Sequence, residues 1–248
     1  MLLTHDRTLV PRGLRLPEGA RLPDPGAAVR IDCACFELSH PDGSRERWFL
    51  DGPGQDLFVP VRGQQPAAPR PALVMDALPA RTRALLGVAP EARLCPDIEA
   101  RPTFAELELD RLRALLEELT AGLRGLTHGH EVCLEEAVDG LLGLGSGSTP
   151  SGDDVLAGAA AAARTLGLPG ARRLGEALTD LSPDATTAAG RAMLREAAAG
   201  FFVLPLSTLA GAWPAAGRST IEALIGVGAS SGADMLAGFL AQTEALYA

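Results

Sequence analysis

The chain contains no lysine: it has 248 residues, and all 22 of its basic residues are arginine. A lysine Schiff base, a lysine general base and a P-loop lysine are therefore excluded from its chemistry. A bound phosphate or carboxylate would have to be held by arginine, by hydroxyl groups or by backbone N–H groups.

Aromatic side chains and positive charge are also scarce. Aromatic residues make up 4% of the chain, and the formal net charge is −9 at pH 7. An acidic chain does not attract the phosphate backbone, so we expect no nucleic-acid partner. The first residues lack a signal-peptide core, and the longest uncharged run, residues 197–217, is interrupted by prolines. We therefore expect a cytoplasmic protein without a membrane partner.

Metal ligands are few. The four cysteines offer one close pair and no second pair to complete a site, so we expect buried, reduced thiols at Cys33, Cys35, Cys95 and Cys133. His128 and His130 are spaced as metal ligands can be, but Glu131 is the only carboxylate beside them. We interpret both histidines as loop or capping residues, and we expect neither a bound metal nor a cofactor.

Two halves of the chain differ in pattern. Residues 1–101 carry short apolar runs between proline- and glycine-rich turns, which is typical of strands. Thr103 and Glu106 then form a capping-box signature, and leucines follow at helical spacing. We predict an α+β fold, with a small β-rich, barrel-like domain over residues 1–101 and a mostly α-helical domain over residues 102–248. Beyond the helix that starts near Thr103, we expect helices near residues 131–142, 151–167, 170–181, 184–199, 204–212, 219–226 and 231–247.

The helical half contains an internal loop–helix duplication. The segments SGDDVLAG, starting at Ser151, and SGADMLAG, starting at Ser231, agree at six of eight positions. Each ends in a glycine, Gly158 or Gly238, on the face of the helix that carries the preceding aspartate. Since glycine lets two helix backbones approach closely, we predict that the helices cross there about a pseudo-twofold axis. Their N-terminal loops would then face one shared cleft.

The loop of the first copy contains more polar and glycine residues than a simple connection between two helices requires. The stretch GLGSGSTPSGDDVLAG, residues 143–158, combines flexible glycines, four hydroxyl groups and two adjacent aspartates. Backbone N–H groups and hydroxyls at a helix N-terminus suit a phosphate or carboxylate. Adjacent aspartates suit instead a magnesium ion, or a carboxylate that orients an amide or ammonium group. We predict that this loop is the functional centre.

The candidate catalytic residues are Asp153 and Asp154. We expect the substrate to be bound by Gly145, Gly147, Ser148, Thr149, Ser151, Gly152, Ser230, Ser231 and Asp234. The S-G-x-D pattern also predicts a capping box in each copy. Asp154 matches Asp234 and would then be structural, which leaves Asp153 more exposed and free to orient an amide. Arg191 or Arg195 could supply positive charge.

The two motifs resemble one family. The string GLGSGSTPSGDDVLAG, followed later by GVGASSGADMLAG, is similar to the AllH-like subunits of oxamate carbamoyltransferase, and the likeness covers much of residues 140–245. Members share a G-L-G-x-G-x-T-P-S-G-D-D signature and a later G-H-[ST]-S-G-x-D segment. Ala229 stands here where the family has histidine, and Ser146 and Ser148 stand where proline and leucine are common. A proton transfer that used this imidazole is thereby lost, whereas anion binding at the first loop does not depend on it.

This resemblance implies a subunit or relative of a carbamoyltransferase of allantoin degradation, which interconverts oxalurate plus phosphate with oxamate plus carbamoyl phosphate. It implies other carbamoyltransferase subunits as partners, and a small anionic or amide ligand such as carbamoyl phosphate, phosphate or oxamate. One alternative is a non-catalytic assembly or regulatory subunit whose glycine-rich helices form a protein interface. Another is a stand-alone enzyme that acts on a different small amide or carboxylate.

Overall fold

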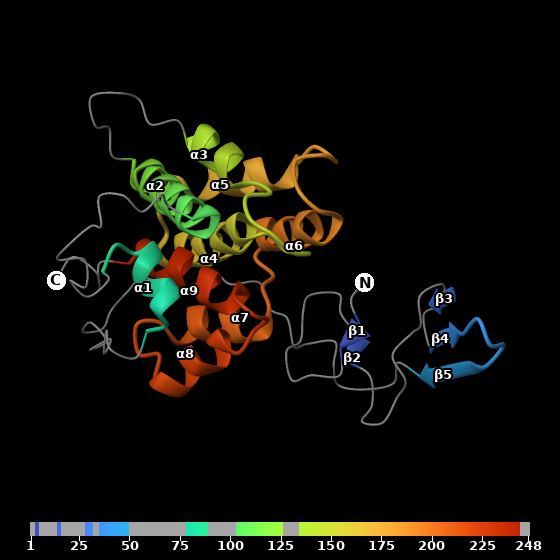
Figure 1. Cartoon of the computed structure of the whole chain (residues 1–248). Coiled ribbons are helices and arrows are strands. Elements are labelled where there is room, and N and C mark those ends of the chain that lie inside the picture. The colour runs from blue at the N-terminus through green and yellow to red at the C-terminus, as the bar shows by residue number, and fades with distance from the viewer. Residues whose placement is uncertain are drawn as a thin grey trace. The chain divides into compact units, whose positions relative to one another are not determined.

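The chain divides into two compact units, residues 1–59 and residues 60–248 (Figure 1). The computed structural model describes residues 35–49, 78–88, 103–125 and 134–243, together with the strand residues 3–4, 14–15 and 28–31. The predicted domain boundary between residues 101 and 102 lies outside the described residues and stays a prediction.

The first unit contains two small sheets. Its strands are β1 (Leu3–Thr4), β2 (Leu14–Arg15), β3 (Ala28–Ile31), β4 (Cys35–Ser39) and β5 (Arg45–Phe49). β1 and β2 pair in parallel, whereas β3, β4 and β5 form an antiparallel sheet in that order. A turn that contains Gly43, with φ of +85°, joins β4 to β5, and the backbone N–H of Ser44 donates to the carboxylate of Asp42 at 2.8 Å. The proline- and glycine-rich turn at Pro41-Asp42-Gly43 is therefore used in a hairpin, as the pattern of turns predicted.

The predicted β-rich, barrel-like domain is wrong. Most of the described residues are helical, and the strands of the first unit form an open three-stranded sheet and a two-residue pair. An apolar run of four to eight residues does not by itself distinguish a strand from a short buried helix. The region from Ala80 to Leu85 illustrates this, because it falls in the predicted β-domain and forms a helix.

The second unit is helical. Its described helices are α1 (Ala80–Leu85), α2 (Phe104–Arg124), α3 (Leu134–Leu141), α4 (Ser151–Leu166), α5 (Ala171–Thr179), α6 (Ala188–Ala199), α7 (Leu204–Ala212), α8 (Arg218–Ile225) and α9 (Ser231–Ala241). Each predicted helix from residue 103 onward is present, although α9 ends at Ala241 and not at residue 247. Glycine and proline between the apolar segments therefore marked the helix ends correctly.

The N-terminus of α2 follows the sequence prediction. The backbone N–H of Glu106 donates to Thr103 Oγ1 at 3.3 Å, and the backbone N–H of Thr103 donates to Glu106 Oε2 at 2.8 Å. This reciprocal pair confirms the capping box. The leucines that follow at helical spacing are buried, namely Leu112, Leu115, Leu116, Leu119 and Leu123.

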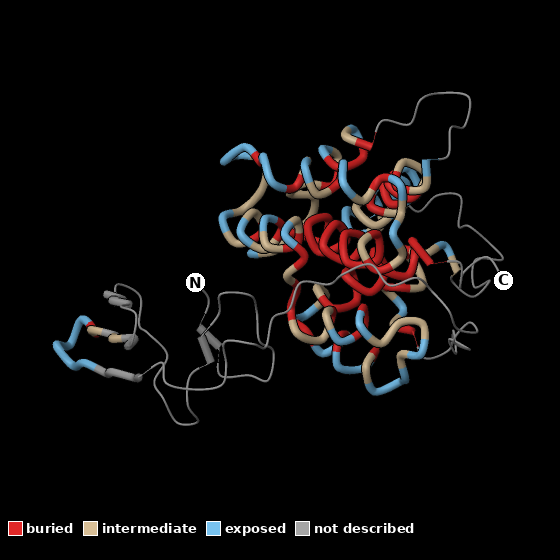
Figure 2. The backbone as a smooth tube through the Cα atoms, turned by 180° about the vertical axis from the view of Figure 1, so that it is seen from behind, coloured by how far each residue is buried: buried red, intermediate tan, exposed pale blue. Residues whose placement is uncertain are grey.

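The duplicated helices α4 and α9 form the centre of this unit. Nearly all residues of both helices are buried, and Figure 2 shows the resulting red core. A Cβ added at Gly158 would lie 1.9 Å from the carbonyl oxygen of Met235, and one at Gly238 would lie 2.1 Å from that of Val155. Val155 and Met235 occupy the same position of the two copies, so the close approach is reciprocal. The predicted pseudo-twofold crossing at these glycines is confirmed.

Replacing Gly158 by alanine is expected to lower the free energy of unfolding by about 2–3 kcal/mol, because the helix backbones must separate to admit the methyl group. Urea denaturation of the full chain measures this. Gly211 of α7 is the matched control, because a Cβ there meets nothing within 4 Å. Gly211→Ala should be neutral or stabilising by up to about 1 kcal/mol through helix propensity alone. Equal free energies of unfolding for the two variants would contradict the inference that Gly158 is needed for the close approach of α4 and α9.

One stretch is apolar and long enough to span a membrane by length and composition, Ala188–Ala212. In the structure this stretch is divided into α6 and α7, and Gly200 ends α6 with φ of +91°. The cytoplasmic location stays a prediction.

Candidate functional site

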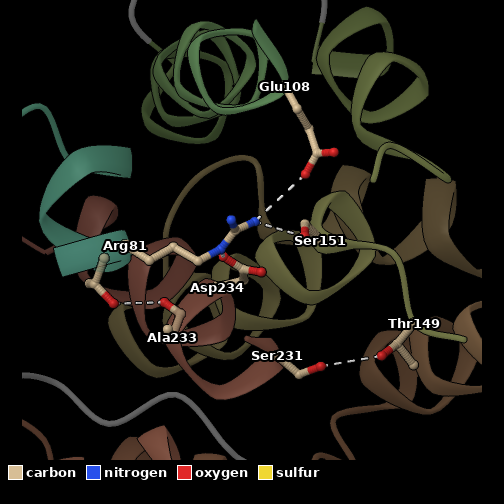
Figure 3. Close-up of polar contacts among 8 residues, drawn as sticks. Arg81, Glu108, Thr149, Ser151, Ser231, Ala233 and Asp234 are labelled. Atoms are coloured by element: carbon tan, nitrogen blue, oxygen red, sulfur yellow. Dashed lines mark hydrogen bonds and ion pairs between the residues drawn. The ribbon is translucent and has the colours of Figure 1, made fainter. Parts of the chain in front are cut away.

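The N-terminal ends of α4 and α9 lie close together beside α1, and Figure 3 shows Ser151, Thr149, Ser231 and Asp234 there. Residues 143–150 lead into α4, with positive φ at Gly143, Gly145 and Gly147. Ser146, Gly147 and Ser148 are exposed. Among the described residues, the backbone N–H groups from Gly145 to Thr149 donate to no backbone acceptor. The loop thus offers backbone N–H groups without a backbone acceptor just before a helix N-terminus.

The serines of the two S-G-x-D segments do not cap their helices. Pro150 is the N-cap of α4 and Ser230 is the N-cap of α9, and neither helix start has a side-chain capping bond. Ser151 and Ser231 are instead the first helical residues. The predicted capping boxes are therefore wrong, and both hydroxyls are directed to partners outside their own helices.

Asp153 holds the first loop in place. Its carboxylate is fully buried and accepts hydrogen bonds from the backbone N–H of Gly143, at 2.9 Å, and from the hydroxyl of Thr186 just before α6. Burial raises its pKa, whereas these two hydrogen bonds lower it. The expectation that Asp153 is the more exposed aspartate is wrong, because its side chain is directed toward α6 and the base of the loop.

Asp154 is the exceptional group of the site. Its side chain is fully buried, and neither carboxylate oxygen has a well-formed hydrogen bond, although the hydroxyls of Ser231 and Thr149 lie close enough to affect its pKa. Burial, with smaller contributions from Asp234 and Asp153, raises its pKa to about 8, although the nearby hydroxyls of Ser231 and Thr149 act in the opposite direction. Asp154 is consequently protonated at neutral pH. A buried polar group without a partner costs free energy, so its presence here calls for an explanation.

Asp234, the counterpart of Asp154, is paired with an arginine. Arg81 of α1 donates from Nε to Asp234 Oδ1 at 2.5 Å and from Nη2 to Ser151 Oγ at 2.9 Å. Glu108 of α2 lies 3.8 Å from the same Nη2. Burial raises the pKa of Asp234, and the hydrogen bond and charge of Arg81 lower it. The backbone of α1 is fixed nearby, because Thr82 Oγ1 donates to the carbonyl oxygen of Ala233 at 2.9 Å.

Each aspartate faces the serine of the other copy. Ser151 lowers the pKa of Asp234, and Ser231 lowers the pKa of Asp154. The pseudo-twofold relation of α4 and α9 therefore extends from the glycine crossing to the polar groups at the helix N-termini. The two loops do converge, as the duplication predicted, since Thr149 Oγ1 and Ser231 Oγ lie 3.3 Å apart.

The other predicted residues divide into two groups. Gly152 and Gly145 are packing positions: a Cβ at Gly152 would lie 1.9 Å from the carbonyl oxygen of Leu141, and one at Gly145 would lie 2.9 Å from the backbone nitrogen of Ser151. Gly147, Ser148 and Ser230 lie at the exposed or half-exposed edge of the loops. The carbonyl oxygen of Ser148 accepts a 2.5 Å hydrogen bond from Thr187, which fixes this edge to α6.

Three important residues were not identified from the sequence. Arg81 supplies the positive charge of the site, whereas Arg191 donates to the carbonyl oxygen of Pro183 and Arg195 is exposed on α6. Thr186 and Thr187 were expected only as part of a helix start. The Thr-Thr pair before an Ala-Gly helix start was the available signal, while Arg81 had none.

No group of three or more histidine, cysteine, aspartate or glutamate residues within the described ranges is arranged to hold a metal ion. The predictions for His128, His130 and the cysteine side chains lie outside the residues that the structure describes.

Comparison with known proteins agrees with the motifs. The family model described as oxamate carbamoyltransferase subunit AllH matches residues 141–243, a range that includes both loops and both duplicated helices. No solved structure matches the chain. Arg81 and α1 lie before the matched range, so this part of the site is outside the family signature. Residues 141–243 of the chain are therefore similar to the oxamate carbamoyltransferase subunit AllH.

Proposed function

We propose that the chain is a carbamoyltransferase subunit that binds a small anionic ligand, such as carbamoyl phosphate, phosphate or oxamate, at residues 145–149. The observation that carries this proposal is the family match over residues 141–243, since this range contains both the loop and its duplicate. AllH is a subunit of a carbamoyltransferase, so other subunits of that enzyme are the expected partners.

The charge distribution supports an anion at the loop. Two adjacent aspartates would ordinarily repel an anion. Here the Asp153 carboxylate is turned inward onto Gly143 and Thr186, and Asp154 carries a proton because its pKa is raised to about 8. The N–H groups and hydroxyls of the loop are then free to donate to the anion, helped by the N-terminal end of the α4 dipole.

The same arrangement gives the two aspartates different roles. Asp153 is a positioning residue, because it fixes the loop and does not face the ligand. Asp154 is the candidate catalytic residue: a carboxylic acid can donate a hydrogen bond to a carbonyl or phosphoryl oxygen as negative charge develops on it. Thr149 and Ser231, whose hydroxyls lie beside Asp154, would complete the donors.

Calorimetric titration of the full chain with carbamoyl phosphate, oxamate and inorganic phosphate tests the proposal. Gly147→Ala is expected to weaken the binding at least ten-fold, because Gly147 has φ of +104°, where an L side chain is strained, although its Cβ would meet nothing closer than 3.9 Å. The loop has to shift to relieve this strain, and its N–H groups shift with it.

Gly167→Ala is the matched control. Gly167 also has positive φ, +63°, and open space around a Cβ, but it lies at the C-terminal end of α4. Its replacement should leave the affinity within two-fold of that of the native chain. Absence of binding heat with all three ligands would contradict the proposal.

The alternative of an assembly subunit with a glycine-rich interface has less support. Gly158 and Gly238 contact each other's helices within the chain and are buried by that contact. They are therefore not available to a partner, and the sequence feature that suggested the interface has an intramolecular explanation.

A further inference from the structure

Arg81 shows what kind of group fits one half of the duplicated site. Its guanidinium is planar, and it bridges the aspartate of one copy and the serine of the other, with Nε on Asp234 and Nη2 on Ser151. Figure 3 shows the side chain reaching from α1 to lie between these two partners. Two N–H donors on one sp² carbon thus bond one oxygen of Asp234 and the hydroxyl of Ser151 at once, while Asp234 Oδ2 has no partner.

The pseudo-twofold operation converts this pair into Asp154 and Ser231. Asp154 corresponds to Asp234 and Ser231 corresponds to Ser151, and each aspartate faces the serine of the opposite copy. No side chain among the described residues takes the place at Asp154 that Arg81 takes at Asp234, since both oxygens of Asp154 lack a hydrogen-bond partner. The two halves of the site therefore have the same aspartate and serine. Arg81 bridges Asp234 and Ser151, whereas no side chain of the described residues bridges Asp154 and Ser231.

We propose that Asp154 and Ser231 form a binding half-site for a ligand group with two N–H donors on one planar carbon, the counterpart of the Arg81 guanidinium. The ligand class includes guanidinium and amidinium groups and the uncharged carbamoyl or ureido group. This inference rests on the proposed function in that it assigns the part of the ligand that lies deepest, beneath the loop that receives the anion.

Two hydroxyl groups lie beside the Asp154 carboxyl group at this half-site. Ser231 and Thr149 are both partly exposed, and their mutual contact of 3.3 Å is a weak hydrogen bond that a better donor can replace. The charged groups around Asp154 are Asp153 on its own helix, Asp234 on α9 and, across Asp234, Arg81 on α1. These groups set the electrostatic environment of a ligand group bound beside Asp154.

The charge of the ligand group determines how its binding changes with pH. A guanidinium cation binds the carboxylate form of Asp154, so its affinity should rise as the pH increases from 7 to 9. A urea group is neutral and matches the acid form, which offers one donor and one acceptor, so its affinity should fall over the same range. The pKa of Asp154, about 8, lies within that interval.

The experiment titrates the full chain with methylguanidinium and with N-methylurea at pH 7 and pH 9, using ligand-observed NMR. We expect one of the two probes to bind the native chain, and we expect Asp154→Leu to weaken that binding at least ten-fold. Asp154→Leu removes the carboxyl group, and circular dichroism checks that the variant folds. Ser231→Ala should weaken binding several-fold and provides a second, milder variant. Asp139→Asn, which alters an exposed aspartate on α3, should leave it unchanged.

The outcomes separate this inference from the proposed function. If neither probe binds, or if Asp154→Leu binds the probe within two-fold of the native chain, the half-site does not exist. If carbamoyl phosphate or oxamate still binds the native chain in that case, the proposed function stands without the half-site. Conversely, probe binding that depends on Asp154 in a chain that binds none of the three anions would support the half-site and overturn the proposed function.

Discussion

Replacing Arg81 by methionine is expected to lower the free energy of unfolding by about 3 kcal/mol at pH 7.5. The Asp234 carboxylate is fully buried and receives its 2.5 Å hydrogen bond from Arg81, so the variant leaves a buried charge without its partner. We expect the lower end of the usual range because the Arg81 side chain is 33% exposed, which lets solvent screen the pair. Urea denaturation measures the difference.

The loss of unfolding free energy caused by Arg81→Met should be larger at high pH than at low pH. Burial already raises the pKa of Asp234, and loss of the arginine, which lowers it, raises it further. A carboxyl whose pKa is higher in the folded than in the unfolded chain stabilises the fold when protonated and loses that contribution as the pH rises. The deficit should therefore be smaller at pH 4.5 than at pH 7.5.

Two controls define the origin of this effect. In an Asp234→Asn background, Arg81→Met should cost much less, because no buried charge remains to be compensated. Arg172→Met removes an ion pair of the same 2.5 Å length, Arg172 to Glu176 on α5, but both side chains of that pair are more than half exposed. Its expected cost is below about 0.5 kcal/mol. If the two arginine variants destabilise equally, the buried pair does not fix α1 to α9.

The helical half of the fold was predictable because its signals are local. The capping box at Thr103, the leucine spacing in α2 and the glycines and prolines between helices act over a few residues. The duplication carried longer-range information, since identical small residues in two helices imply one contact geometry. This is why the crossing at Gly158 and Gly238 could be anticipated from sequence alone.

The roles of the aspartates could not be derived in the same way. Pro150 takes the N-cap position, so Ser151 becomes the first helical residue, one place beyond the cap assumed by the S-G-x-D pattern. Adjacent residues on a helix point about 100° apart. Which of Asp153 and Asp154 meets α6 and which meets α9 therefore depends on tertiary packing, and the repeat could not show that both side chains are fully buried.

Arg81 was unpredictable for a related reason. It lies 70 residues before Ser151 and 153 residues before Asp234, on a six-residue helix without a side-chain cap. Short helices of this kind have weak local signals, and a partner so distant in sequence leaves no pattern in a single chain. The first 101 residues were predicted to form a β-rich domain of short strands and turns, and α1 is the only helix described in that region.

Replacing Asp154 by asparagine is expected to change the pH dependence of stability more than any other single substitution in the site. The folded pKa of Asp154 is about 8, against about 4 for an aspartate in an unfolded chain. Its contribution to stability is thus fully present below about pH 4 and is lost as the pH rises through 8. Between pH 4 and pH 7, the ionisation equilibrium of this group alone should lower the free energy of unfolding of the native chain by about 3–4 kcal/mol.

Asparagine keeps the shape of the side chain and does not ionise, so Asp154→Asn removes this pH-dependent loss. The difference in unfolding free energy between variant and native chain should grow in favour of the variant by that amount from pH 4 to pH 7, measured by urea denaturation at each unit of pH. Asp139→Asn, at an exposed position, should follow the native curve. A native chain that tolerates such a destabilising acid is consistent with a group kept for binding and catalysis. Parallel curves for the native and Asp154→Asn chains would show instead that Asp154 ionises normally and would remove it as the proton donor of the site.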